Sequence, residues 1–460
     1  MVRTFALLGP ALALAALVAL AGCEEDLSPT IDPFPISVDR SSGSLAMGAR
    51  TNVDALGDVP MVLDTLTPLS VIDTYGGGGG EVPAPRRLRT SFEIISAGAT
   101  PIGRARYESV TVIDVHPCQT AGAVCRVGLE PLEGGACGST PGPNTAEYRA
   151  ILGGDLLSRS AVRLDFRDAA APAIQFFPDI AGDSPRHCRA GLPVISTPLS
   201  GGSTIQIEGG EVRYTPNRLP LNVCAEFDPE DSDTASGTDF LMLLATGIGP
   251  SVMSETAYGR YVRSLDAVCT ADATRCDSPD DDFDPPVPYD LLPNECLQLP
   301  SGPTVARVHT LRRLAVVGDG NSDENRGPCE ERRANVIMAG GGCDGDVACP
   351  CKKDGDLLCR ADAIVELEPE VAIPIAVLPD SHPLLQALRE ELRPGQAEVD
   401  GVLGLSALTA LRLDLDYPGS RVLFRCEDEV TSRGRRACTP RTEVFDEDGT
   451  SPADRCPDPP

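Results

Sequence analysis

The sequence contains no tryptophan, few aromatic residues (4% of 460 positions) and only two lysines, Lys352 and Lys353. Lysine and arginine together number 39 against 68 acidic residues, so the formal net charge is -29 at pH 7. A polyanion of this size repels the phosphate backbone of DNA and RNA. The shortage of positive charge therefore excludes nucleic acid as a partner.

Several signatures of catalysis and nucleotide binding are also missing. The chain has neither a G-x-S-x-G nor an H-E-x-x-H segment, which are typical of α/β-hydrolases and zinc peptidases. The glycine run that ends at Cys343 lacks the lysine of a phosphate-binding loop. The 4 histidines are scattered and none accompanies a nucleophile. We therefore expect no cofactor, and no motif supports a serine hydrolase or a zinc peptidase.

The first 22 residues have the layout of a secretory signal peptide. Arg3 precedes an apolar stretch, residues 5–20, that is short for a membrane-spanning helix. The segment 20–23, Leu-Ala-Gly-Cys, resembles the bacterial lipobox, and this resemblance implies lipidation of Cys23. The alternative is an ordinary signal peptide that happens to contain a cysteine.

The residues after Cys23 predict a protein that is tethered to a membrane. The polar segment 23–47 is expected to be the tether. No second segment predicts a spanning helix, so the membrane is expected as a partner through the lipid alone. The expected location is the cell envelope, periplasmic or cell-surface, with the outer membrane favoured.

The number of cysteines also favours the cell envelope as the location. The chain has 17 cysteines, and setting Cys23 aside leaves an even number that could form disulfides throughout. Such density is typical of an oxidising compartment. The cluster at 343–359 could instead hold zinc, but its spacing does not give two C-x-x-C knuckles. Disulfides are therefore favoured, and no metal site is predicted.

Two pairs of segments repeat in the same order along the chain. Residues 59–67 (VPMVLDTLT) and 240–247 (FLMLLATG) are apolar runs that end in a small polar turn. Residues 151–157 (ILGGDLL) and 402–408 (VLGLSAL) each place a glycine after two apolar residues. The first pattern is typical of a buried strand that bends sharply into a loop. The repetition predicts two related lobes.

The remaining pattern favours strands over helices. The 45 glycines and 42 prolines indicate many turns. Segments 92–94 and 110–115 predict a hairpin. One helix is predicted, with Asp380 or Ser381 as its N-cap and Pro383 in its first turn.

The order of the repeated motifs resembles that of the pepsin and retropepsin-like aspartic peptidases. In each lobe of that family an apolar strand ends in Asp-Thr-Gly, and a later apolar-apolar-Gly segment braces the loop. Residues 62–65 (VLDT) with Gly153 match the first lobe, although Leu66 replaces the motif glycine. Residues 244–247 (LATG) with Gly404 match the second lobe.

The resemblance implies a fold and a set of catalytic positions. The implied fold is mainly β, with two pepsin/retropepsin-like β-barrel lobes, a central cleft, few short helices and a disulfide-rich insertion in the second lobe. The implied catalytic positions are Asp64, Thr65, Ala245, Thr246 and Gly247. The expected segments are a signal peptide at 1–22, the lipidated cysteine and tether at 23–47, the first lobe at 48–182, a linker at 183–200, the second lobe at 201–428 with a Cys- and Asp-rich insertion at 264–360, and an acidic tail at 429–460.

The family's reaction requires two carboxylates that share one proton across the lobe interface. Asp64 occupies the first position, but Ala245 has no ionisable group. Asp239 lies about 20 Å from Ala245 along an extended strand, and Glu255 would need an unusual fold-back to reach it. We therefore expect hydrolysis to be lost or severely reduced, and a peptide or protein to bind in the cleft instead.

Two alternative functions remain open. One is an active or weakly active endopeptidase that uses Asp64 as its only catalytic carboxylate. The other is a structural surface lipoprotein that binds calcium through acidic segments such as 319–330 and 446–458. Neither segment matches a calcium loop fully, and a solvated acidic surface is the simpler interpretation. The oligomeric state is not predicted.

Overall fold

The computed structural model describes the chain in separate segments, and the fold is described for these segments alone. They are residues 27–28, 34–35, 37–38, 47–53, 56–74, 84–95, 104–114, 125–132, 135–137, 146–166, 173–177, 192–196, 202–226, 237–271, 287–299, 302–311, 314–317, 364–367, 373–390, 398–408, 411–417, 421–425 and 438–440.

An eight-stranded sheet forms what we call the first lobe. Its strands are β1 (Leu27–Ser28), β3 (Ser37–Val38), β4 (Met47–Val53), β5 (Gly57–Leu63), β6 (Val71–Ile72), β7 (Arg86–Ile95), β8 (Arg104–Asp114) and β11 (Ala150–Leu152). They follow the order β1-β8-β6-β11-β5-β4-β3, and β7 pairs with both β4 and β8. The antiparallel pairing of β7 with β8 confirms the predicted hairpin.

A twelve-stranded sheet forms the second lobe. Its strands are β9 (Cys125–Pro131), β10 (Ala146–Tyr148), β17 (Pro220–Glu226), β18 (Gly237–Leu244), β19 (Ser251–Ser254), β20 (Asn294–Leu299), β21 (Gly302–Leu311), β22 (Leu314–Val317), β23 (Ile364–Leu367), β24 (Ile373–Leu378), β25 (Gly401–Leu403) and β28 (Cys438–Pro440). The order is β10-β9-β20-β21-β24-β19-β25-β18-β17-β22-β23-β28. Two strands from the first half of the chain, β10 and β9, therefore extend this sheet.

A six-stranded sheet joins the two halves of the chain. Its strands are β2 (Phe34–Pro35), β12 (Ala161–Asp165), β13 (Ala173–Phe177), β14 (Leu192–Ile195), β26 (Arg412–Asp416) and β27 (Arg421–Arg425), in the order β14-β27-β26-β12-β13-β2. At its centre Arg163 of β12 faces Asp414 of β26. The guanidinium donates from Nε and Nη2 to the two carboxylate oxygens at 2.6 and 2.8 Å. Strands β15 (Ser203–Ile207) and β16 (Gly210–Tyr214) form a separate hairpin next to the start of β7, where the Glu208 amide donates to the Pro85 carbonyl.

Helices are few among the described residues. They are α2 (Gly154–Leu157), α4 (Glu255–Ala271) and α6 (Pro383–Glu390), with short 3₁₀ turns at η4 (Tyr289–Leu291) and η6 (Leu405–Ala407). The predicted helix is found as α6, whose Leu385 and Leu388 are buried, but the predicted cap at Asp380 or Ser381 is wrong. The helix is capped by His382, whose Nδ1 accepts a hydrogen bond from the Leu384 amide at 3.2 Å. In the part of the chain that is described, no helix has the length and apolar character needed to span a bilayer.

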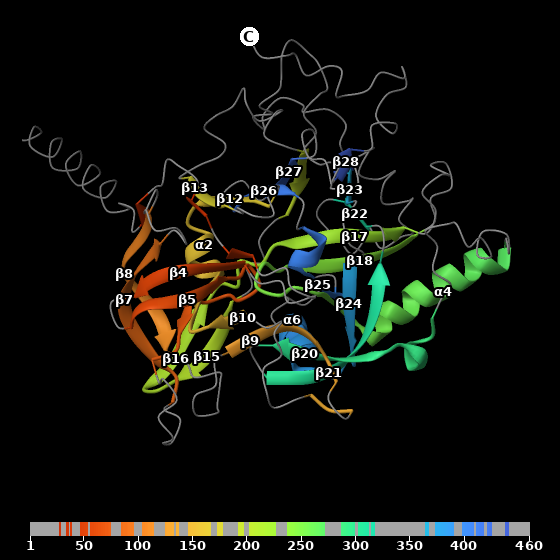
Figure 1. The fold of residues 1–460 in the computed structure, drawn as a ribbon, viewed down its shortest axis with the longest axis horizontal. Coiled ribbons are helices and arrows are strands. Elements are labelled where there is room, and N and C mark those ends of the chain that lie inside the picture. The colour runs from red at the N-terminus through yellow and green to blue at the C-terminus, as the bar shows by residue number, and fades with distance from the viewer. Residues whose placement is uncertain are drawn as a thin grey trace, which may run out of the picture.

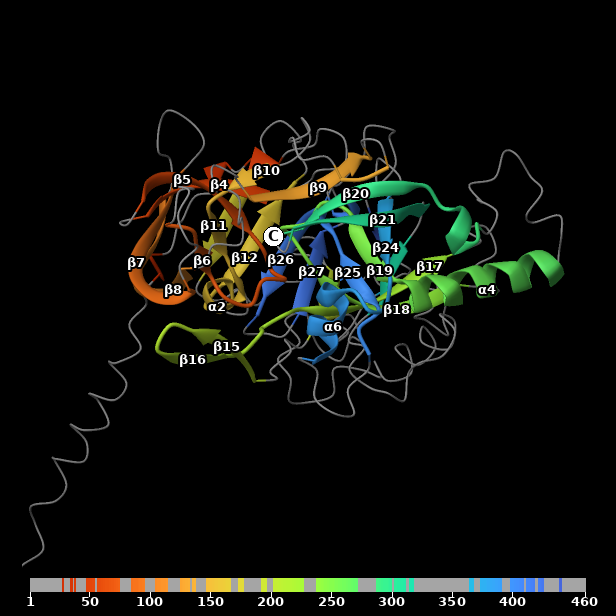
Figure 2. The ribbon, with the colours of Figure 1, turned by 90° about the horizontal axis from the view of Figure 1, so that it is seen from below.

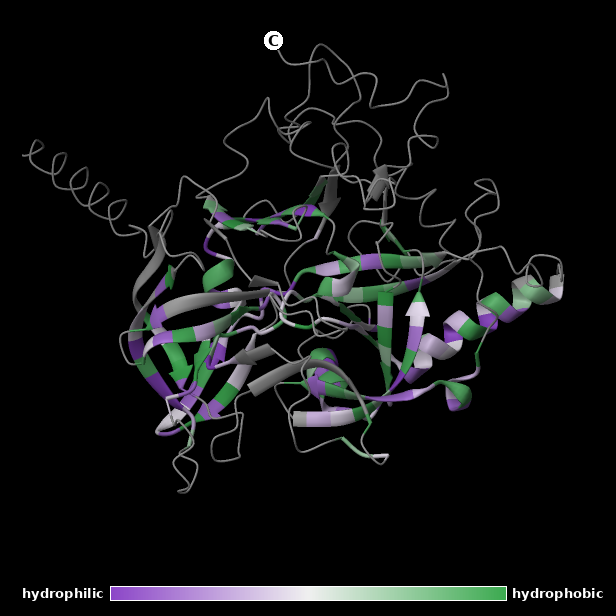
Figure 3. Ribbon diagram, viewed as in Figure 1, coloured by the Kyte–Doolittle hydropathy of each residue, from purple (hydrophilic) through white to green (hydrophobic). Residues whose placement is uncertain are grey.

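Helix α4 was not predicted from the sequence. Its first turn is stabilised by Ser254, whose hydroxyl accepts a hydrogen bond from the Ala257 amide at 3.1 Å. Figure 3 shows hydrophilic and hydrophobic residues mixed along its length, as expected for a helix that buries one side only. Tyr258 and Tyr261 of this helix pack on His309 of β21, with ring centroids 5.4 and 5.5 Å from it.

The repeated segments form the same arrangement in both lobes (Figure 2). In the first lobe β11 lies parallel to β5, with Leu152 beside Leu63. In the second lobe β25 lies parallel to β18, with Leu403 beside Leu244. Strands β6 and β19 pair antiparallel with β11 and β25 in matching registers. Strands β11, β19 and β25 are buried throughout, and β5 is buried over Met61–Leu63, where it approaches its turn. This burial explains the apolar sequences of these segments.

The predicted mainly-β fold with two lobes and few short helices is confirmed (Figures 1 and 2). The predicted disulfides are also found where the chain is described: Cys137 bonds to Cys296, and Cys224 and Cys269 are disulfide-bonded as well. Within the expected insertion at 264–360, strands β20 to β22 belong to the sheet of the second lobe.

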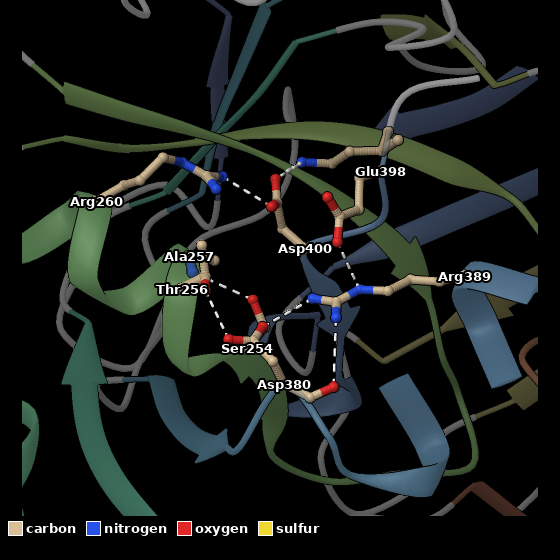
Figure 4. A network of polar contacts seen from close by, with 9 residues as sticks. Ser254, Thr256, Ala257, Arg260, Asp380, Arg389, Glu398 and Asp400 are labelled. Carbon is tan, nitrogen blue, oxygen red and sulfur yellow. Dashed lines mark hydrogen bonds and ion pairs between the residues drawn. The ribbon is translucent and has the colours of Figure 1, made fainter. Parts of the chain in front are cut away.

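A polar network fixes the start of α4 to the strands behind it (Figure 4). Arg260 forms an ion pair with Asp400 at 2.8 Å, and the Leu241 amide donates to the same carboxylate. Nearby, Arg389 of α6 pairs with Asp380 at 2.9 Å and with Glu398 at 2.8 Å. The network therefore holds β25 and β18 against both helices of the second lobe.

The pair at the centre of the six-stranded sheet gives a test of how the lobes are joined. Replacing Arg163 with leucine leaves the fully buried Asp414 carboxylate without its bidentate partner, so we expect a loss of about 3–5 kcal/mol in the free energy of unfolding. The double variant R163L/D414L also removes the unpaired buried carboxylate and should recover most of the lost free energy of unfolding. Urea denaturation of the single and double variants measures both values. A double variant as unstable as R163L would contradict this account.

Candidate functional site

The candidate site lies where two turns meet at the lobe junction. One turn follows β5 and contains Asp64 and Thr65, and the other follows β18 and contains Ala245 and Thr246. Thr65 and Thr246 stand 181 residues apart and occupy the same place in the two repeats. The structure therefore brings together the catalytic positions that the resemblance implied.

Reciprocal hydrogen bonds connect the two turns. The Thr65 hydroxyl donates to the carbonyl of Leu244 at 2.7 Å, and the Thr246 hydroxyl donates to the carbonyl of Leu63 at 2.8 Å. The Thr65 amide donates to the Thr246 hydroxyl at 3.2 Å. Both threonines are completely buried, so each bond satisfies a carbonyl that water does not reach.

The two bracing glycines lie behind these turns, at equivalent places. The Gly153 amide donates to the Ser70 hydroxyl and the Gly404 amide to the Ser251 hydroxyl, both at 3.0 Å. A Cβ atom on Gly153 would lie 2.6 Å from the carbonyl of Leu69, and one on Gly404 would collide with the carbonyl of Pro250. Only glycine fits at either position, because the backbone of the turn approaches so closely.

The Asp64 carboxylate is buried and fully hydrogen-bonded. The residue has 3% relative exposure. Oδ1 accepts from the Leu66 amide at 3.0 Å and from the Gly247 amide at 3.1 Å. Oδ2 accepts from the Thr67 amide at 3.1 Å and from the Thr67 hydroxyl at 2.6 Å. A carboxylate has about four acceptor positions, so protein donors occupy them all.

Ala245 breaks the symmetry of the site. In the first turn the Leu66 amide donates to a side chain two residues earlier, Asp64. The equivalent amide in the second turn is that of Gly247, but Ala245 offers it no acceptor. It donates instead across the junction to Asp64. Asp64 therefore receives donors from both lobes, and the methyl group of Ala245 is completely buried.

Three further ionisable side chains interact with Asp64, and sequence reasoning did not find them. Buried Arg218 donates from Nε to the Leu66 carbonyl at 2.8 Å. Burial lowers the pKa of Arg218 to about 10, although the charges on Tyr214 and Asp64 raise it. Burial and the Asp64 charge both raise the pKa values of Tyr148 and Tyr417. These residues lie outside the matched motifs, so no local signal could have identified them.

No second carboxylate interacts with Asp64 among the described residues. Asp239 lies in β18, where it pairs with Cys224. Glu255 begins α4, and its charge acts on Tyr289. Among the described residues, the Asp64 carboxylate therefore has no carboxyl partner with which to share a proton, and this part of the chain contains no cluster of potential metal ligands.

Comparison with known proteins shows no family. No family model matches the chain, and no curated protein matches it. Among solved structures, it is similar to basic 7S globulin from soybean at 9% identity and a TM-score of 0.37, over 86% of this chain and 95% of that one. It is also similar to conglutin gamma, a basic 7S globulin from lupine seeds, at 11% identity and a TM-score of 0.36, over 91% of this chain and 99% of that one.

These findings correct the family assignment made from the sequence. The pepsin and retropepsin-like aspartic peptidases were assigned on four short motifs around Asp64 and Ala245. No family model supports that assignment, and the solved structures to which the chain is similar include seed globulins. Short motifs of a strand end and a bracing glycine describe how two turns pack, and this packing does not require membership of the peptidase family.

The close contact between Gly247 and Asp64 provides a test of the packing at the site. A Cβ atom on Gly247 would lie 2.5 Å from Cγ of Asp64, so Gly247→Ala should lower the free energy of unfolding by about 1–3 kcal/mol. Gly202→Ala is the control, because a Cβ there meets nothing within 4 Å. Chemical denaturation measures both variants. Equal stability of the two would show that the contact does not exist.

The hydrogen bonds of Asp64 provide a second test. In Asp64→Asn one oxygen becomes an NH₂ group that faces donors, so we expect a loss of about 1–3 kcal/mol in stability. Asp266→Asn changes an exposed aspartate of α4 and should have almost no effect. Thermal unfolding of both proteins measures the difference. An Asp64→Asn protein as stable as the wild type would show that these bonds do not stabilise the junction.

Proposed function

We propose that this protein binds a peptide or a protein segment at the lobe junction without cleaving it, while a lipid on Cys23 holds it at the cell envelope. The observation that carries the proposal is the complete hydrogen bonding of Asp64 opposite Ala245. The remaining support comes from the paired turns and from the charge of the chain.

Proton transfer at Asp64 is the step that catalysis would require and that the site opposes. A carboxylate that activates water must accept a hydrogen bond from that water. Every acceptor position of Asp64 already has a donor from Leu66, Thr67 or Gly247. Activation of a water would require one of these bonds to break, and no opposite carboxyl group exists among the described residues to polarise a carbonyl. Binding requires neither event.

The surroundings of Asp64 favour binding. Thr67, Pro68 and Leu69 of the first turn are partly exposed at the junction, whereas the second turn is buried. An extended peptide is recognised by main-chain hydrogen bonds and by pockets for its side chains. Because the net charge is -29, neutral or basic segments are favoured over acidic ones.

The membrane anchor is part of the proposal and rests on the sequence alone. Several predicted features lie outside the described residues: the signal peptide, Cys23, the acidic segments 319–330 and 446–458, and the cysteines at 343–359. Labelling with a radioactive fatty acid in a bacterial host would test the anchor, because Cys23→Ser should abolish incorporation. Label retained by that variant would exclude lipidation at Cys23.

A turnover assay tests the absence of catalysis. We expect the purified folded protein to release no fluorescence from a pool of quenched peptides between pH 3 and 7. Turnover that a transition-state mimic blocks and that Asp64→Asn abolishes would refute the proposal and establish a peptidase that uses Asp64.

Calorimetric titration with the same peptides, unquenched, tests the binding. We expect saturable binding that Leu69→Trp abolishes, because an indole at the partly exposed Leu69 would occupy the junction and leave the hydrogen bonds of Asp64 in place. The matched control is Thr204→Trp, which places the same group on the exposed hairpin β15–β16 and should bind as the wild type does. No saturable heat from the wild type, or equal binding by both variants, would reject the lobe junction as a peptide site.

A further inference from the structure

The two halves of the chain are joined at a second place, away from the six-stranded sheet. Strand β9 comes from the first half but pairs antiparallel with β20 of the second lobe, in a register that sets Glu130 opposite Cys296 and Gly128 opposite Gln298. Strand β10 completes a hairpin with β9 and also contacts β5 of the first lobe. We call β9, β10 and Cys137 between them the inter-lobe arm.

A disulfide secures this arm. Cys137 bonds to Cys296, which lies 159 residues later in the sequence and is completely buried in β20. Cys137 itself is partly exposed. Since Cys296 is also the residue that pairs with the arm at Glu130, the covalent bond and the strand pairing hold the arm at the same point of the second lobe.

Each end of the arm is connected to one turn of the site. Arg149 follows β10, and its amide donates to the carbonyl of Pro60 at 3.0 Å, within β5, the strand that ends just before Asp64. From β20 the paired strands β21, β24, β19 and β25 lead to the second turn. In Figure 1 the arm and β20 lie on one side of β5, β18 and β25, and β12 and β26 lie on the other. Figure 2, seen from below, shows β9 running from the first lobe to β20.

This arrangement restricts the motion of the lobes. Two bodies joined along β12 and β26 can separate only by opening on the opposite side, as in a hinge. The arm and its disulfide close that side. The turns of the site are accordingly held together, with Thr65, Ala245 and Thr246 completely buried.

We propose that the Cys137–Cys296 disulfide and the inter-lobe arm form a redox-controlled latch on the peptide site. The latch rests on the function proposed for the lobe junction. A dithiol reductant supplies two electrons and two protons, so that Cys137 and Cys296 become thiols while the dithiol becomes a cyclic disulfide. Release of the arm then lets the lobes part about the six-stranded sheet, so that the turns around Asp64, where the latched protein already binds, become more accessible to a peptide.

The test measures access to the turns in the full folded protein. The variant C137S/C296S removes the bond without leaving a free thiol from it. We expect hydrogen exchange, followed by mass spectrometry, to become at least tenfold faster in peptides that cover 64–70 and 245–251, and to stay unchanged in those covering β7 and β8. Leu388→Ala is the control for general loosening, because it opens a cavity in the core that also packs Leu66 and Ala245 while the Cys137–Cys296 bond stays in place.

Two results would overturn the latch: unchanged exchange at both turns, or acceleration that is equal throughout the molecule and equal to that of Leu388→Ala. If the double variant does not fold, wild-type protein that is reduced and alkylated after folding replaces it in the same measurement. Titration with the peptide pool separates the two proposals. Faster hydrogen exchange at the turns without peptide binding supports the latch and rejects the proposed function. Peptide binding with unchanged exchange rejects the latch and supports the proposed function.

Discussion

The reciprocal hydrogen bonds of Thr65 and Thr246 are the constraint on which the rest of the structure depends. Each hydroxyl donates to a buried carbonyl of the opposite repeat, at Leu244 and Leu63, so that neither turn is complete without the other. A buried carbonyl that loses its donor costs about 1–3 kcal/mol. These bonds fix the backbone at the positions of Asp64 and Ala245 whatever side chains stand there. The geometry of the junction is therefore independent of the chemistry that it carries, which is why a symmetric frame can hold a carboxylate on one side and a methyl group on the other.

The single carboxylate has become a point of attachment between the lobes. Asp64 accepts hydrogen bonds from Leu66 and Thr67 in its own turn. It also accepts one from the Gly247 amide, which in a symmetric site would donate to a side chain at position 245. Buried Arg218, bound to the Leu66 carbonyl, supplies an opposite charge close to it. A buried charge is tolerated when it is hydrogen-bonded and compensated in this way. The same interactions that make Asp64 stable leave it with no acceptor position for a water molecule.

The sequence predicted the parts of the fold that are encoded locally. The repeats around Asp64 and Gly404 predicted two related lobes because a buried strand and a bracing glycine need particular residues. Helix α4 was missed because its start depends on a cap at Ser254 and on the packing of Tyr258 against His309, which no short pattern reveals. The pairing of β9 with β20 and the partner of Cys137 could not be predicted, since disulfide connectivity and distant strand pairing follow from the folded arrangement. Arg218 was missed for the same reason.

The six-stranded sheet has a consequence for biosynthesis. Strand β12 leaves the ribosome long before β26, its partner 251 residues later, and β9 likewise precedes β20. Until the C-terminal half emerges, both strands present unpaired edges, which in nascent chains attract chaperones or neighbouring strands. Contacts so distant in sequence also make folding slow. The six-stranded sheet is thus expected to form only after β26 has been synthesised, so that quality control of this protein acts on a chain that already contains both lobes.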